Sequence, residues 1–316
     1  MIVETLAPGV HAIDAPFEDV PLQIYVVEGT RLTVIDPGVP ETAAGRLAEG
    51  LRELGHRLAD VELLINTHGH HDHRGGNGVV AEHNPDVAIA AHPADVAWVS
   101  DTERYIAEEY LRFRPAWEPP AEAVDRIRRL CGADLPVTVE LAHGDEIDLG
   151  GGHVLSVEHI PAHTDGSVAL LHRAGKVLFT GDALQARGTP LQRRADFFPN
   201  YRHVEEYRRS LDFFAGCGAE IVGTAHTGVC TAHRAAQLVA ESRRFADEYA
   251  AVIEAALAKA GSATVSELSR ATREHYPRYD DGSPLLNTMC AYLTDMCDVG
   301  TARLDGDRFT WLGTTS

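Results

Sequence analysis

Short apolar runs separated by turn residues dominate the first 90 residues of this 316-residue chain. Runs of this length, rich in β-branched residues, predict buried strands at 22–27, 32–35, 61–66 and 87–91. Between them, apolar residues recur at helical spacing over 41–54, and a second helix is expected near 76–83. The pattern therefore predicts a mixed α/β unit that begins with a strand meander over residues 1–37.

The second part of the chain repeats this arrangement after a different kind of segment. Glycine-rich turns separate a second set of predicted strands at 137–141, 146–149, 153–160, 168–172 and 177–180. A helix at 203–215 and a strand at 220–224 complete this set. The second set of predicted elements therefore mirrors the first.

Residues 93–136 interrupt the strand pattern. They are helical in pattern, contain five large aromatic residues and are broken by prolines. We expect most of these aromatics to form a core for the segment itself, with one or two facing a binding site.

From residue 231 the pattern becomes helical again. A long alanine-rich helix is predicted near 231–259, followed by helices at 264–276 and 284–298 and a β-hairpin over 301–312. The order helix, helix, hairpin is similar to a winged helix. The predicted division is therefore a domain over 1–230, with a helical insertion at about 93–136, and a long helix plus winged-helix-like domain over 231–316.

Charge and composition narrow the classes of function. The formal net charge is −19, and residues 262–316 hold five arginines against eight acidic residues, a net of −3. This balance argues against binding to nucleic acid or to an anionic membrane. There is no apolar run long enough to cross a bilayer, and the N-terminus lacks the regions of a signal peptide, so we expect a cytoplasmic protein. The five cysteines form no C-x-x-C pair, and we expect free thiols.

The chemistry is concentrated in the segment 67–76, Thr-His-Gly-His-His-Asp-His-Arg-Gly-Gly. Four potential metal ligands, His68, His70, Asp72 and His73, lie within six residues and directly after a predicted strand. Imidazole and carboxylate groups suit Zn²⁺, Fe and Mn. The structural alternative is a histidine-rich surface loop, and context elsewhere in the chain decides between the two.

That context is present. The segment resembles the H-x-H-x-D-H signature of the metallo-β-lactamase superfamily, and three further motifs of that family follow in order, carrying His163, Asp182 and His226. The resemblance implies an αββα sandwich, in which two sheets pack against each other and helices cover the outer faces. It also implies that His68, His70 and His163 bind one divalent ion, that Asp72, His73 and His226 bind a second, and that Asp182 bridges them. Zn²⁺ is the expected metal, with Fe or Mn as alternatives. His71 occupies the variable position and is given no ligand role.

The resemblance also implies a reaction. Two divalent ions about 3.5–4 Å apart lower the pKa of a shared water towards ~7, so that a bridging hydroxide can attack an activated acyl carbon, with Asp72 as a ligand that also orients the nucleophile. The presence of Asp182 argues against true β-lactamases, and Gln185 stands where acyl-homoserine lactonases carry tyrosine. The glyoxalase II-like branch remains, with a thioester as the expected substrate. The alternatives are a lactonase, a phosphodiesterase or nuclease, a mononuclear iron dioxygenase, and a DNA-binding regulator.

Substrate contacts are expected after the bridging aspartate. Residues 184–202 contain the candidates Arg187, Arg193, Arg194, Phe197, Phe198 and Tyr201. The arginines could hold a carboxylate or the phosphates of a coenzyme A or carrier-protein arm, or could simply form a solvated basic loop. The expected partner is thus a small-molecule acyl substrate, and the C-terminal domain is expected to cover the active site or to mediate a homodimer.

Overall fold

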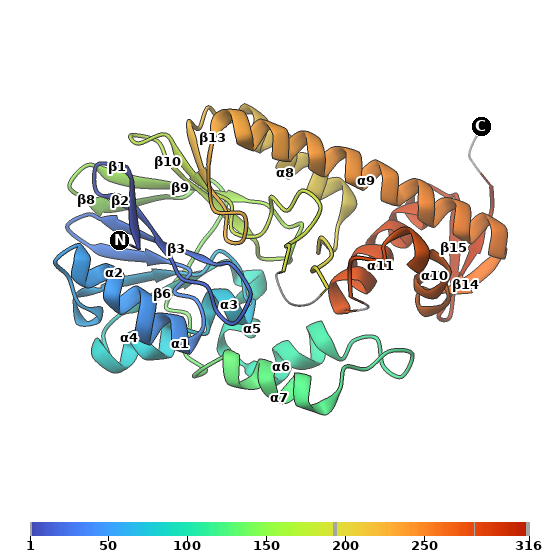
Figure 1. Ribbon diagram of the computed structural model, residues 1–316, viewed down its shortest axis with the longest axis horizontal. Helices are drawn as coiled ribbons and strands as arrows, with labels where there is room; N and C mark the ends of the chain where they lie inside the picture. Colours follow the sequence, from blue (N-terminus) through green and yellow to red (C-terminus); the bar gives the residue numbers. More distant parts are fainter. Residues whose placement is uncertain (1, 192–194, 281, 314–316) are drawn as a thin grey trace.

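The computed structural model describes residues 2–191, 195–280 and 282–313. Its larger part is built on two β-sheets (Figure 1). The strands of the first sheet, in spatial order, are β1 (Val3–Ala7), β2 (Val10–Asp14), β3 (Gln23–Glu28), β4 (Leu32–Ile35), β5 (Leu63–Ile65), β6 (Ala88–Ala91) and β7 (Val139–Glu140). Those of the second are β13 (Val229–Thr231), β12 (Ile221–Gly223), β11 (Val177–Phe179), β10 (Val168–His172), β9 (His153–His159) and β8 (Glu146–Gly150).

Alternation along the strands explains how the sheets pack. In β3, Tyr25 and Val27 belong to the core between the two sheets, whereas Ile24 and Val26 belong to the core beneath the outer helices. Successive side chains of a strand point to opposite faces, so a strand that is apolar at every position can be buried on both faces. Strands β4, β5 and β6 pair in parallel, which brings their carboxyl ends to the same edge.

Helices cover both outer faces. On the first sheet lie α1 (Pro40–Thr42), a π-helical turn (Ala43–Leu47), α2 (Ala48–Glu53) and α4 (Asn77–His83). On the second lie α8 (Val204–Gly216) and α9 (Ala232–Ala260), which share a core with β10, β11 and β12. The expected αββα sandwich is therefore confirmed.

The insertion forms a small helical unit below the first sheet (Figure 1). Its helices are α5 (Val96–Ser100), α6 (Thr102–Tyr105), a π-helical turn (Ile106–Tyr110) and α7 (Ala121–Leu130). Trp98, Tyr105, Ile106, Ile127 and Cys131 form its core. Two of the expected aromatics thus pack inside the unit, whereas Tyr110 and Trp117 line a cavity.

The C-terminal region packs along the end of α9. It contains α10 (Val265–Thr272), a 3₁₀ turn (Arg273–His275), α11 (Ser283–Asp298) and a small sheet of β14 (Ser262–Thr264), β16 (Arg308–Trp311) and β15 (Ala302–Asp305). The predicted helices and hairpin are present. Strand β14 is an addition, because Ser262–Thr264 pairs with the free edge of β16 instead of simply ending the long helix.

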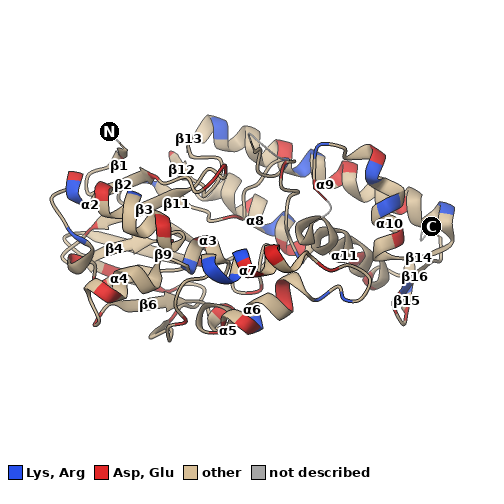
Figure 2. Ribbon diagram, turned by 60° about the horizontal axis from the view of Figure 1, so that its bottom comes forward, with Lys and Arg blue, Asp and Glu red and all other residues tan. Residues whose placement is uncertain are grey.

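Charged side chains of both signs are interspersed along the helices, α9 included (Figure 2). Within the ranges described, each helix is too short or too polar to cross a bilayer.

Candidate metal centre

The seven predicted metal-binding residues come together from four segments, each of which follows a strand. His68 and His70 follow β5, and Asp72 and His73 lie on the short helix α3 (His71–Arg74). The remaining three occupy loops after strands of the second sheet: His163 after β9, Asp182 after β11 and His226 after β12. Residues that are distant in sequence therefore meet because the two sheets are stacked.

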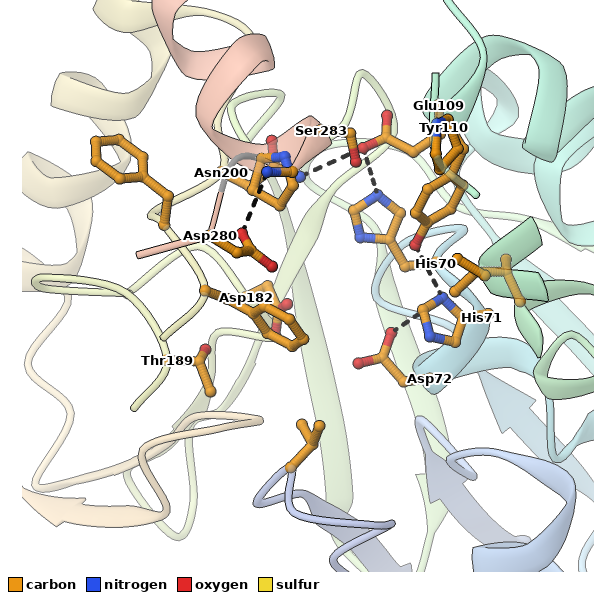
Figure 3. A pocket seen from close by; sticks show the side chains of 18 of the residues that line it. His70, His71, Asp72, Glu109, Tyr110, Asp182, Thr189, Asn200, Asp280 and Ser283 are labelled. Carbon is orange, nitrogen blue, oxygen red and sulfur yellow. Dashed lines mark hydrogen bonds and ion pairs between the residues drawn. The ribbon is translucent and has the colours of Figure 1, made fainter. Parts of the chain in front are cut away.

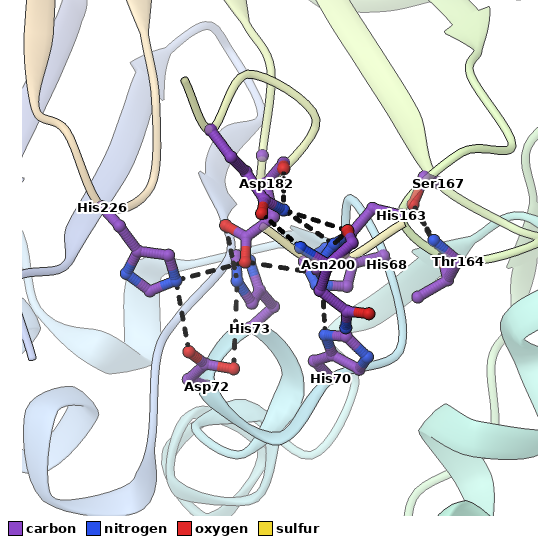
Figure 4. A network of polar contacts seen from close by, with 12 residues as sticks. His68, His70, Asp72, His73, His163, Thr164, Ser167, Asp182, Asn200 and His226 are labelled. Atoms are coloured by element: carbon purple, nitrogen blue, oxygen red, sulfur yellow. Dashed lines mark hydrogen bonds and ion pairs between the residues drawn. The ribbon is translucent and has the colours of Figure 1, made fainter. Parts of the chain in front are cut away.

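Their ligand atoms form two groups, each with all atoms within 4.8 Å of one another: His68, His70, His163 and Asp182 in one, and Asp72, His73 and His226 in the other. Asp182 lies between the groups (Figure 4). Its Oδ2 is 3.5 Å from Nε2 of His163 and 3.2 Å from Nε2 of His226, and its Oδ1 is 3.4 Å from Nε2 of His73.

Hydrogen bonds from the protein orient the histidine rings. Four rings use Nδ1 for this purpose and so leave Nε2 facing the cluster: His68 with Thr67 Oγ1 (3.1 Å), His73 with Asp36 Oδ2 (2.9 Å), His163 with the Asn200 carbonyl (2.6 Å) and His226 with the Pro21 carbonyl (2.7 Å). His70 is reversed, with Nδ1 facing Nε2 of His163 at 2.9 Å. Such outer contacts are the usual means of fixing the ring of a metal ligand.

The donor set fits a divalent metal. Nε2 of His68, Nε2 of His73 and Oδ1 of Asp182 are buried without a hydrogen-bond partner. Buried polar atoms left in this way cost free energy, so their convergence on one space needs an explanation. A cation coordinated by imidazole nitrogens and carboxylate oxygens supplies it, and this mixture of donors suits Zn²⁺ and its neighbours.

Electrostatics differ between the two groups. Burial, reinforced by neighbouring histidines, lowers the pKa of His68 well below its usual value and that of His70 to about 3, so both rings are neutral. Burial also opposes charge on His226, but the carboxylates of Asp182 and Asp72 outweigh it and raise the pKa of His226 to about 10. Protons on this second group therefore balance its carboxylates when no cation does so.

Two buried aspartates that the sequence did not single out hold the ligand loops. Asp36, at the end of β4, accepts hydrogen bonds from the Thr67 amide (2.8 Å), the Thr67 hydroxyl (2.7 Å) and His73. Asp95, in the insertion, accepts from the Gly69 amide (2.7 Å), the Thr164 hydroxyl (2.6 Å) and the Gly166 amide (2.9 Å). Asp95 thus ties the loop of His68 and His70 to the loop of His163. A Cβ on Gly166 would meet the Asp95 carboxylate at 2.6 Å, so glycine is required there.

Glu109 is a third residue missed from the sequence. It is almost fully buried in the insertion and forms an ion pair with Arg202. Burial alone would raise the pKa of Glu109, but the charge of Arg202 and the nearby His70 hold it below its usual value. The carboxylate therefore stays ionised beside the metal centre (Figure 3).

A cavity of about 310 Å³ opens over the metal centre. His70, Asp72, His163, Asp182 and His226 form one end of it. The remaining lining residues come from the loop before β3, the insertion, residues 185–200 and the start of α11. The insertion and the C-terminal region both contribute walls to this cavity.

The predicted substrate contacts are distributed over three environments. Phe197 and Phe198 line the cavity. Arg187 is exposed, pairs with Glu248 at 2.8 Å and lies over the Phe245 ring, away from the metal centre. Tyr201 is buried in the core, where it stacks on Tyr207 and bonds to the Tyr292 hydroxyl at 2.7 Å. The structure therefore does not bring Arg187 or Tyr201 to the cavity. Arg193 and Arg194 lie outside the described residues.

The sandwich fold and the paired His and Asp groups define a protein of the metallohydrolase class. The family model described as metallo-beta-lactamase superfamily matches residues 19–226, and the chain belongs to that superfamily.

Two relatives with named enzymatic activities match part of the chain. The chain is 35% identical over 173 residues to an acyl-coenzyme A thioesterase, MBLAC2, of Gallus gallus, a match that covers 51% of this chain and 57% of the relative. It is 32% identical over 155 residues to a hydroxyacylglutathione hydrolase of a Synechococcus strain, covering 49% and 44%. The chain thus spans about half the length of the relatives it matches.

Among solved structures, a metallo-beta-lactamase family protein from Thermus thermophilus superposes with a TM-score of 0.75. The superposition covers 97% of this chain and 100% of the other, at 24% identity. This likeness shows the fold, and it extends over the C-terminal region as well as the sandwich.

Proposed function

We propose that the protein is a dinuclear metal-dependent thioesterase that hydrolyses a small acyl thioester, with coenzyme A or a carrier protein as the thiol. The observation that carries this proposal is the position of Asp182, which lies between two groups of metal-ligand type at the end of a largely apolar cavity. A carboxylate in that position can contact two cations and offset their mutual repulsion.

In this proposal His68, His70 and His163 would hold the first ion. Asp72, His73 and His226 would hold the second, and Asp182 would contact both. Zn²⁺ is the proposed metal, with Fe or Mn as alternatives. Two divalent ions bound there would lower the pKa of a water towards ~7 and polarise a substrate carbonyl.

The side chains around the centre then act on the water and on the substrate. Asp72, whose Oδ2 lies 3.4 Å from Nε2 of His226, is the proposed acceptor of a hydrogen bond from the attacking water and would also bind metal. Burial raises the pKa of Tyr110, so its hydroxyl stays protonated and can donate to the substrate. Water adds to the acyl carbon, the carbon–sulfur bond breaks, and a carboxylic acid and a thiol leave.

Two observations favour a thioester over the other acyl bonds. The names of two relatives, an acyl-coenzyme A thioesterase and a hydroxyacylglutathione hydrolase, both describe release of an acyl group from a thiol carrier. Gln185, which lines the cavity three residues after Asp182, is an amide and not the phenol of acyl-homoserine lactonases.

The test is a comparison of substrate classes on one preparation purified without chelator, with its metal content measured. Thioesters of coenzyme A and of glutathione, lactones, phosphodiesters and persulfides are offered in parallel, with Asp182→Ala as the metal-site control. We expect turnover of thioesters that Asp182→Ala abolishes. Preferential lactone or phosphodiester hydrolysis, or oxygen-dependent persulfide oxidation by a single iron, would overturn the proposal.

A further inference from the structure

We infer that the end of the cavity away from the metals is a binding site for an uncharged aliphatic acyl chain. This inference rests on the proposed thioesterase function and names the acyl class of its substrate. It rests on two observations. The side chains that line the cavity beyond the metal ligands are largely apolar, and no lining side chain in the described part of the chain carries an unpaired positive charge.

The apolar wall is formed by segments that lie far apart in the sequence. Val124 and Ile127 lie one turn apart on α7 and face the cavity. Phe17 and Val20, from the loop before β3, and Phe197 also line it. Phe17, Val20 and Ile127 are almost fully buried, so this wall belongs to packed structure and is not a loose surface patch.

Charge on the lining residues argues against an acyl group that carries its own carboxylate. Beyond the histidines at the metal end, Arg126 is the single positive side chain among the described lining residues. One edge of its guanidinium is already used, because Nε and Nη2 donate to the two oxygens of Glu18 at 2.8 and 2.6 Å. Glu109, which also lines the cavity, is paired with Arg202 and supplies no positive charge. A carboxylate buried there would lose its hydration and would meet only a guanidinium whose charge Glu18 already balances.

Burial of methylene groups gives the expected size of the effect. Each methylene moved from water into an apolar site improves binding by about fourfold at most. We therefore expect kcat/KM to rise by about two- to fourfold per added methylene until the chain reaches the end of the cavity, and then to stop rising. A terminal carboxylate on a chain of the same length should cancel most of this gain.

The first measurement is a chain-length profile with coenzyme A thioesters from acetyl to hexadecanoyl, together with an ω-carboxylated thioester of eight carbons. We expect octanoyl to exceed acetyl, and also its carboxylated counterpart, by at least about tenfold in kcat/KM. Thioester turnover with a flat profile, or with a preference for the carboxylated chain, would overturn the acyl-chain site and leave the thioesterase proposal intact.

Variants of α7 locate the site. Val124→Trp should fill the cavity and lower kcat/KM for octanoyl more than tenfold, with a clearly smaller loss for acetyl. Glu122→Trp makes the same substitution on an exposed position of the same helix and serves as the control. Ala123→Phe, which also projects into the cavity, is the second variant in case Val124→Trp does not fold. An unchanged profile in a folded cavity variant contradicts the inference.

Direct binding separates the inference from the proposed function. Octanoate and octanedioate have the same length and the same carboxylate for the metal end, and differ only at the far end. Calorimetric titration of the metal-loaded protein should show octanoate binding at least about tenfold more tightly, and Val124→Trp should abolish the difference. That result without any thioester hydrolysis would sustain the acyl-chain site and refute the thioesterase; equal binding of the two acids would refute the site.

Discussion

Oε1 of Glu109 lies 3.8 Å from Nε2 of His70, the ring whose Nδ1 faces His163. The same oxygen accepts a hydrogen bond of 2.8 Å from the Asn287 side chain on α11. Arg202 holds the other oxygen. A carboxylate of the insertion therefore connects a candidate metal ligand to the C-terminal helix, so that two segments outside the sandwich contribute to the position of one imidazole.

This relationship makes Glu109 a positioning residue. Glu109→Gln should weaken metal binding by about 10- to 100-fold, the range typical for outer partners of ligating histidines. Competition with a chromophoric chelator measures the affinity. Glu118→Gln, which removes an exposed carboxylate of the same segment, is the control. Asn287→Ala should give a smaller loss in the same direction, whereas unchanged affinity in a folded Glu109→Gln protein would contradict the role.

Asp182 should contribute more to metal binding than Glu109 does, because its two carboxylate oxygens face both groups of candidate ligands. Asp182→Ala is expected to abolish activity and to lower the content of both metals, since two cations would then face each other with less negative charge between them. Elemental analysis and a thermal unfolding curve measure these effects, and binding energy lost at the site should appear as lost stability. Asp212→Ala, which removes an exposed ion pair on α8, should leave both unchanged. Activity above about a tenth of the original with full metal content would refute bridging.

Metal binding should release protons. With its pKa raised to about 10, His226 carries a proton at pH 8 in the metal-free protein, and the carboxylates of Asp36 and Asp182 likewise raise the pKa of His73 in spite of its burial. A ligating ring must be neutral, so each such proton leaves when metal enters, and the apparent affinity rises with pH below the folded-state pKa. Titration calorimetry in two buffers of different ionisation enthalpy should show release of at least one proton; identical heats in both buffers would contradict this.

The strands of the two sheets and the close approach of the candidate ligands in segment 67–76 could be predicted because their signals are local. Alternation along a strand and the spacing of His68, His70, Asp72 and His73 depend on neighbours in sequence. Asp95 and Glu109 gave no such signal, because their partners Gly166 and Asn287 lie 71 and 178 residues away. Asp36 stands directly after a predicted strand, but its hydrogen bond to His73 depends on the arrangement of loops that are distant in sequence.

The substrate contacts could not be predicted because they depend on tertiary packing and not on neighbours in sequence. Position after Asp182 suggested that the whole segment 184–202 lines the cavity. Tertiary packing divides it instead: Phe198 reaches the cavity, whereas Tyr201, three residues later, turns into the core against Tyr207 with ring centroids 4.1 Å apart. An aromatic residue satisfies either environment, so its type does not decide between them.

The C-terminal region should be required for stability of the whole chain. Met289 on α11 is fully buried in the core that also contains Tyr249 and Ile253 of α9. Met289→Ala should lower the free energy of unfolding by about 2–5 kcal/mol, as for other large-to-small changes in a core. Chemical denaturation measures this, and Leu304→Ala, at an exposed position of β15, is the control with little expected effect. Truncation at about residue 261 should expose the same core and impair solubility or turnover.

The final prediction is that this region does not bind DNA, although its helices and hairpin are similar in order to a winged helix. Residues 262–316 carry a net charge of −3, and α11 contains no Lys or Arg. Two of the five arginines in residues 262–316 already form ion pairs within the protein: Arg278 pairs with Asp196, and Arg308 pairs with Glu267 at 3.1 Å. Release of counterions by neutralised phosphates supplies most of the affinity for duplex DNA, and a recognition helix needs donors that reach base edges.

Fluorescence anisotropy with labelled duplexes, repeated over a range of salt concentrations, should therefore show no specific binding at physiological salt. Specific binding that Arg303→Ala and Arg308→Ala abolish would contradict this prediction and favour a regulator that uses the metal centre as a sensor.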